Sequence, residues 1–115
     1  MKKILSILML LGISTSIVFA ASGGFKDTIS PKSSTVAEIL KMNNNSYVSV
    51  QGNIVKRISK DKYSFKDSSG TITVEIDDDK WGGVNANTQD KLELIGEVEK
   101  KYNSVELDVD SVRKL

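Results

Sequence analysis

The 115-residue chain contains no cysteine and no histidine. Without cysteine, no disulfide can brace the fold, so its stability has to come from an apolar core. The same two absences remove Cys-His and Ser-His nucleophile systems and the ordinary ligands of a zinc site. Catalysis would have to rely on carboxylates, lysine or tyrosine. We therefore expect a protein that is not an enzyme and that needs no cofactor.

Net charge is almost absent as well, because 16 basic residues face 15 acidic ones. A nearly neutral chain gives no support for binding a polyanion. The charges are nevertheless unevenly distributed: the segment 21–66 is mainly basic, whereas Glu75 to Asp110 is mainly acidic. Complementary strands that form surface ion pairs are one explanation of this pattern, and they would contribute little to stability.

The one long apolar run lies at the N-terminus. Lys2 and Lys3 precede the run Ile4–Phe19, which only glycine and hydroxyl residues interrupt, and Val18-Phe19-Ala20 suits signal peptidase. We expect residues 1–20 to be a cleaved signal peptide that directs export to the periplasm. A membrane anchor is the alternative, but the run is short and no stop-transfer cluster follows it, so the processed protein should not span a membrane. No cysteine follows the run, which excludes a lipoprotein.

The remainder is long enough for one small domain. Residues 21–33 are rich in Gly, Ser and Lys, include the only proline, and are expected to be flexible. The domain itself is expected over residues 34–115. It should begin with a short helix, because Thr35 and Glu38 have the spacing of a capping box. The expected buried stripe of this helix is Val36, Ile39, Leu40 and Met42.

After this helix the apolar period changes from 3.6 to 2, which predicts strands. Gly52 interrupts the first and longest strand, as a sharp bend or bulge requires. Asp67-Ser68-Ser69-Gly70 predicts a hairpin turn, and the polar stretch 77–90 a long connection. Five strands in this order fit the Greek-key OB-fold barrel, and closure of the barrel is favoured over an open sheet because it leaves no exposed edge. The predicted strands cover Tyr47–Ile58, Lys62–Lys66, Thr71–Ile76, Leu92–Val98 and Val105–Val109.

Several segments closely resemble the bacterial OB-fold (BOF) family of periplasmic stress-tolerance proteins, the YgiW/YdeI group. The resemblance runs from Val36 to the C-terminus. It rests on Gly52-Asn53-Ile54-Val55, Tyr63-Ser64-Phe65-Lys66-Asp67, the run from Gly70 to Asp77, Lys80-Trp81, Gly96-Glu97-Val98 and the run from Asn103 to Val109. It implies a periplasmic, non-enzymatic binding protein that supports tolerance to envelope stress. The chain departs from the family at Asp78, where a histidine is common, and at Glu99, where an aspartate is common.

An acidic set is the first candidate ligand site. In an OB-fold the third strand lies beside the fifth, so Glu75 and Asp77 should neighbour Glu106 and Asp108, with Asp79 close by. Clustered carboxylates repel one another unless something cationic neutralises them. The set predicts a site for a divalent cation or another cationic ligand. A solvated acidic surface that aids solubility is the other interpretation.

Two aromatic residues form a second candidate site. Trp81 lies in the long connection and Tyr102 in the last hairpin, where their rings could stack on a peptidoglycan-type glycan. Alternatively, Trp81 closes one end of the barrel as part of the core. Nucleic acid is not expected as a ligand, because the predicted outer face of the second and third strands lacks exposed aromatics on which bases could stack.

These features together predict an exported OB-fold binding module for a cation, a cationic ligand or a cell-wall glycan. The alternative is an interaction protein that docks on an envelope protein and has no small-molecule ligand.

Overall fold

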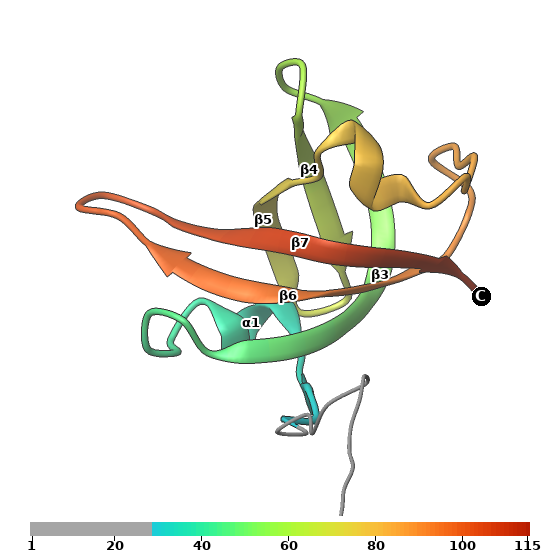
Figure 1. The fold of residues 1–115 in the computed structure, drawn as a ribbon. Coiled ribbons are helices and arrows are strands. Elements are labelled where there is room, and N and C mark those ends of the chain that lie inside the picture. Colours follow the sequence, from blue (N-terminus) through green and yellow to red (C-terminus); the bar gives the residue numbers. More distant parts are fainter. Residues whose placement is uncertain (1–28) are drawn as a thin grey trace, which may run out of the picture.

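The computed structural model describes residues 29–115. The predicted signal peptide and most of the predicted flexible segment lie outside these residues. Among the described residues, no helix is both long enough and apolar enough to cross a membrane. Figure 1 shows strands wrapped into a barrel. In chain order the elements are β2 (Lys32–Ser33), α1 (Val36–Ile39), β3 (Tyr47–Arg57), β4 (Lys62–Asp67), β5 (Gly70–Glu75), the 3₁₀ helix η3 (Asp78–Trp81), β6 (Leu92–Lys100) and β7 (Val105–Lys114).

The long strand β3 closes the barrel by serving two neighbours. Its first half pairs with β6 and its second half with β4, both antiparallel. The remaining neighbours follow in the order β4, β5, β7 and β6, with β5 and β7 parallel. This arrangement is the five-stranded OB-fold barrel predicted from the strand pattern. The short strand β2, which pairs with β3 in parallel, was not predicted.

The core follows the predicted alternation. The inward positions of β3, β4, β5 and β6 are buried, and α1 adds its own apolar face. No polar or charged residue of the described chain is buried. One expectation needs correction: Leu40, predicted to belong to the buried stripe of the helix, is 40% exposed. The core residues are Val36, Ile39, Val48, Val50, Tyr63, Phe65, Ile72, Val74, Ile76, Leu92, Leu94, Val98, Leu107 and Val109.

Gly52 lies where β3 passes close to β4. A Cβ atom at this position would be only 3.0 Å from the Phe65 ring and would collide with the Lys66 carbonyl group. The irregular pairing of β3 with β4 lies slightly farther along, between Ile54 and Lys56. The glycine therefore permits the close approach of two backbones, while the bulge sits beyond it.

The capping box at α1 forms as predicted. The Glu38 amide donates to Thr35 Oγ1 at 3.2 Å, and the Thr35 amide donates to Glu38 Oε1 at 2.9 Å. The helix comprises only one turn, and Leu40 is its C-cap, which explains why Leu40 does not join the buried stripe. A long-range hydrogen bond from the Val36 amide to Asp67 Oδ2, at 2.9 Å, fixes α1 to the β4–β5 turn.

Candidate functional site

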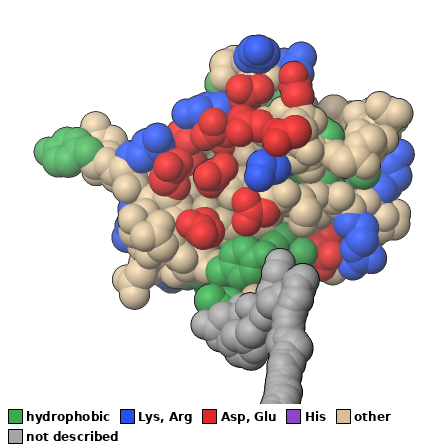
Figure 2. Space-filling model, viewed as in Figure 1, with side chains coloured by type: hydrophobic (Ala, Val, Ile, Leu, Met, Phe, Trp, Pro, Cys, Tyr) green, Lys and Arg blue, Asp and Glu red, His purple; other side chains and the backbone are tan. Residues whose placement is uncertain are grey.

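Acidic side chains gather over β5, β6 and β7 on one side of the barrel (Figure 2). The strand register produces this concentration. Glu75 is opposite Asp108 in the β5–β7 pair, and Glu99 is opposite Glu106 in the β6–β7 pair. We call the acidic side chains on or just after these strands the acidic face. They are Glu75, Asp77, Glu97, Glu99, Glu106, Asp108 and Asp110.

Three carboxylates converge within this face. Glu75, Glu99 and Glu106 each place one carboxylate oxygen within 4.8 Å of the other two, and all three side chains are partly buried. They come from three neighbouring strands, so their separation is fixed by the sheet. Carboxylate oxygens are the ligands that hard divalent cations such as Ca²⁺ and Mg²⁺ prefer. Among the described residues, the oxygens of this cluster are close enough together that one metal ion could contact all three side chains.

Two cationic side chains, Lys62 and Lys101, already lie at this cluster. Lys62 Nζ is 3.1 Å from Glu106 Oε1 and 3.3 Å from Oε2, and only the contact with Oε2 has hydrogen-bond geometry. Glu106 Oε1 is buried and receives no hydrogen bond from the described residues. The hydrogen bond and the charge of Glu106 raise the pKa of Lys62, and the charges of Glu75 and Glu99 act in the same direction. Lys101 Nζ lies 3.8 Å from Glu99 Oε1, so two ammonium groups face the three carboxylates.

The remaining repulsion appears in two pKa shifts. Burial raises the pKa of Glu75 above its ordinary value, and the charges of Asp108 and Asp77 add to the rise. Burial likewise raises the pKa of Asp108, with contributions from Glu99 and Asp110. Both shifts mean that the folded protein disfavours the ionised form of these groups. A bound cation would remove part of this cost.

The structure brings together most of the predicted acidic set. Glu75, Glu106 and Asp108 lie on adjacent strands, and Asp77 follows the end of β5. Asp79 lies in η3, is exposed, and is not among the charges that act on Glu75 or Asp108.

Glu99 and Lys62 were missed as members of this site. The pairing of β6 with β7 in their hairpin is the signal that could have identified Glu99, because it sets Glu99 opposite Glu106.

The two predicted aromatic residues do not form one platform. Trp81 is partly buried against the core, and its ring meets that of Tyr63 edge to face, with a centroid distance of 5.7 Å. Tyr102 is 99% exposed. The turn between β6 and β7 projects to the left of Figure 1, away from η3. Only one of these rings at a time could contact a small glycan.

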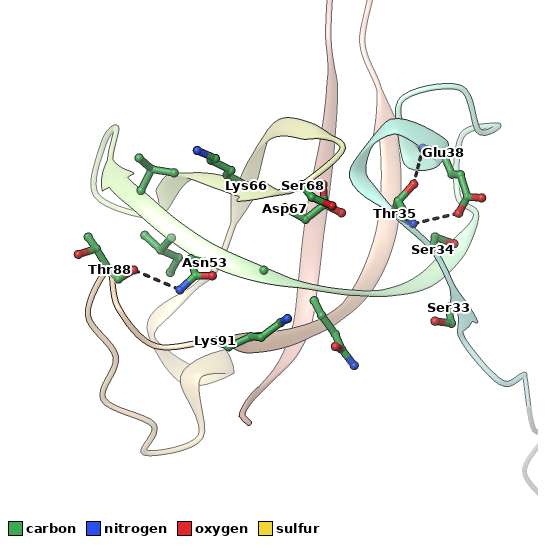
Figure 3. Close-up of a pocket in the computed structure, with 14 residues that line it drawn as sticks. Ser33, Ser34, Thr35, Glu38, Asn53, Lys66, Asp67, Ser68, Thr88 and Lys91 are labelled. Atoms are coloured by element: carbon green, nitrogen blue, oxygen red, sulfur yellow. Dashed lines mark hydrogen bonds between the residues drawn. The ribbon is translucent and has the colours of Figure 1, made fainter.

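A polar groove of about 780 Å³ runs along β3, as Figure 3 shows. The capping box of Thr35 and Glu38 lies at one end. At the other end, Asn53 Nδ2 donates to Thr88 O at 3.2 Å. Lys66 and Lys91 are its cationic residues. Its acidic groups, Glu38 and Asp67, accept hydrogen bonds from backbone amides at the start of α1, so they serve to hold the helix in place.

Comparisons with known proteins agree with this fold. A family described as "Bacterial OB fold (BOF) protein" matches residues 13–114. Protein YgiW of Escherichia coli (strain K12) is 38% identical over 128 residues, which cover 100% of this chain and 98% of the relative. A calcium-regulated OB-fold protein of Pseudomonas aeruginosa, CarO, is 33% identical over 108 residues, with 94% and 92% covered.

Solved structures give the same picture. The structure of the hypothetical protein ygiW from E. coli superposes with a TM-score of 0.71 and 46% identity, over 73% of this chain and 90% of that one. The telomere capping protein Ten1 from Saccharomyces pombe has a TM-score of 0.61 over 74% of this chain and 81% of that one, at 15% identity. At that low identity the second similarity concerns the fold alone.

Proposed function

Because this chain belongs to the bacterial OB-fold (BOF) family, we propose that it is an exported binding protein for envelope stress tolerance whose acidic face binds a divalent cation. The observation that carries the proposal is the convergence of Glu75, Glu99 and Glu106, whose carboxylate oxygens lie within 4.8 Å of one another. A cation there would be held by residues from β5, β6 and β7.

The charge balance leaves negative charge for a further cation. Lys62 and Lys101 supply two positive charges to three carboxylates, and Glu106 Oε1, although 3.1 Å from Lys62 Nζ, accepts no hydrogen bond from the described residues. Calcium accepts six to eight oxygen ligands at flexible positions, so three carboxylates with water would suit it. The name of the relative CarO, a calcium-regulated OB-fold protein, supports calcium as the first ion to test.

Thermal unfolding in the presence of salts tests the proposal. Binding to the folded state alone raises the melting temperature, so calcium chloride should stabilise the protein more than sodium chloride at the same ionic strength. Glu99→Gln and Glu75→Gln should each weaken this difference. Asp79→Asn is the matched control, because it also removes one negative charge but lies outside the cluster. Equal effects of magnesium, calcium, zinc and sodium salts would contradict cation binding.

Export is part of the same proposal and can be tested separately. Val18-Phe19-Ala20 suits signal peptidase, so the processed chain should begin at Ala21. Mass spectrometry of the intact protein from a periplasmic extract measures this directly. Full-length chain in the membrane fraction would contradict both export and cleavage.

A second function, docking on an envelope protein, is favoured by one observation. Tyr102 is 99% exposed at the tip of the β6–β7 hairpin, and tyrosine is among the residues that contribute most to protein interfaces. Tyr102→Ser should abolish the capture of an envelope partner while leaving the calcium response unchanged. Loss of the calcium response in this variant would instead tie the hairpin to the cation site.

A further inference from the structure

A cleft of about 660 Å³ lies between the β3–β4 pair and the connection that follows η3. Ile54, Arg57 and Tyr63 line it from the strands, and Trp81 and Val84 from the connection. No residue of the acidic face lines this cleft. Its single acidic lining residue is Asp78. The cleft is therefore a separate feature with its own chemistry.

The inner part of the cleft is apolar and aromatic. Ile54 and Trp81 are partly buried and pack against the core. The Trp81 ring meets the Tyr63 ring edge to face at an angle of 86°, which fixes the position of both. Val84 is also partly buried in the connection. An apolar ligand group that enters the cleft would exchange water for these surfaces.

The rim carries two cations. The Arg57 guanidinium lies 5.3 Å from the centre of the Tyr63 ring and donates a hydrogen bond to Tyr63 Oη at 2.9 Å. A guanidinium has five N–H donors, so this bond leaves most of them available. Lys56, the residue before Arg57 on β3, also lines the cleft. In the described part of the chain, neither residue forms an ion pair within 4 Å.

The wall opposite the strands is held in a defined position. Gly82 and Gly83 have φ values of 58° and 81°, which glycine adopts without strain, and the Val84 amide donates to Trp81 O at 3.0 Å. Asn53 ties the far end of the connection to β3, since its Nδ2 donates to Asp90 O at 2.9 Å. The cleft is thus formed before any ligand arrives, which lowers the entropy cost of binding.

We propose that this cleft is a binding site for a small organic carboxylate, whose aromatic or aliphatic body packs on Trp81, Ile54 and Val84. Arg57 holds the carboxylate at the rim, and Lys56 adds a second positive charge to the lining. The free donors of Arg57 are the argument for this ligand, because the charges of Asp78 and Asp61 act on Arg57 but neither acid forms an ion pair with it among the described residues. The ligand is opposite in sign to the cation proposed for the acidic face, so the two sites are independent.

Trp81 is the only tryptophan of the chain, so its indole N–H gives a single, assignable NMR signal inside the cleft. The probe is phenylacetate, and phenylacetamide is its neutral control of nearly the same shape. We expect saturable movement of the indole signal at millimolar phenylacetate. Because a charge-assisted hydrogen bond contributes to binding, phenylacetamide should bind about tenfold more weakly.

Variants complete the test. Arg57→Gln and Lys56→Gln should each weaken phenylacetate binding, whereas Lys60→Gln, which removes a lysine from outside the lining, should not. Lys56→Gln covers the case in which Arg57→Gln disturbs Tyr63. Equal affinity for phenylacetate and phenylacetamide would overturn the proposal. So would the absence of any indole shift, or unchanged binding in both variants.

Discussion

Glu75 and Asp108 occupy directly opposite positions in the parallel pairing of β5 and β7, so two negative charges share one rung of the barrel. Like charges in such positions destabilise a sheet. The pKa values of both groups are raised, first by burial and then by neighbouring carboxylates.

The first prediction concerns this pair and pH. A raised pKa means that protonation favours the folded state, so this contribution to stability is complete below the ordinary values of 4.5 for Glu75 and 3.8 for Asp108. It is lost as the pH rises through the raised values. Glu75→Gln and Asp108→Asn should therefore stabilise the protein by about 0.5 kcal/mol at neutral pH. In acid, the free energy of unfolding of both variants should equal that of the unchanged protein.

Urea unfolding at a series of pH values measures this difference. Asp79→Asn is the control, because its side chain is exposed and does not act on the pair. If Glu75→Gln raised the free energy of unfolding by the same amount from acid to neutral pH, the stabilisation would not come from removal of the charge.

The second prediction concerns Asp67. Its burial acts to raise its pKa, but hydrogen bonds from Ser69, Val36 and Gly70 outweigh this effect and hold the pKa below the ordinary value of 3.8. The stability that Asp67 contributes is present above that value and is lost as the pH falls through the lowered pKa. Asp67→Ala should destabilise the protein by about 2 kcal/mol at neutral pH, because several backbone amides lose their acceptor.

Asp67→Asn separates charge from hydrogen bonding in the same measurement. Ser69 and Gly70 both donate to Oδ1, and asparagine retains this oxygen. Val36 donates to Oδ2, which asparagine replaces with an NH₂ group that cannot accept a hydrogen bond. We expect an intermediate loss for Asp67→Asn. If Asp67→Ala and Asp67→Asn were as stable as the unchanged protein, the attachment of α1 to this turn would be unimportant.

The third prediction concerns Gly52. Its Cβ would collide with the Lys66 carbonyl group and lie 3.0 Å from the Phe65 ring, and backbone atoms cannot move aside cheaply. Gly52→Ala should therefore destabilise the protein by about 2 kcal/mol. Gly70→Ala is the matched control, because its Cβ would meet only a Val36 methyl group at 3.5 Å. Thermal or urea unfolding that ranks the two variants equally would be evidence against the close approach.

The fourth prediction concerns Lys62. Lys62→Met should lower stability at neutral pH, because Glu106, which is 12% exposed, would lose its only ion-pair partner in the described chain. In a Glu106→Gln background the same change should have a much smaller effect. This double-mutant cycle, measured by urea unfolding, isolates the interaction. Additive effects of the two substitutions would mean that the ion pair contributes nothing to stability.

Local chemistry allowed most of the barrel to be predicted. Alternation of apolar residues identified five strands, the spacing of Thr35 and Glu38 identified the start of α1, and Gly52 marked the long strand. These signals depend on residues two to four apart in sequence, whose relative positions any helix or strand fixes. The prediction was wrong at Leu40 because the apolar spacing shows which face of a helix is buried but does not show that the helix ends after one turn. The elements β2 and η3 were missed because they are too short to show a period.

The sequence by itself thus determined the five-stranded barrel and the absence of disulfide and histidine chemistry. The predicted strand order also set Glu75 beside Glu106 and Asp108, but only the tertiary structure decided which further charged and aromatic residues meet. Glu99 joins Glu75 and Glu106 because strand register sets it opposite Glu106, and Tyr102 lies far from Trp81 because its hairpin projects from the barrel. A hairpin such as β6–β7 can be inferred from the sequence, but its exact register, and the place of residues outside it, are set by the packing of the whole core.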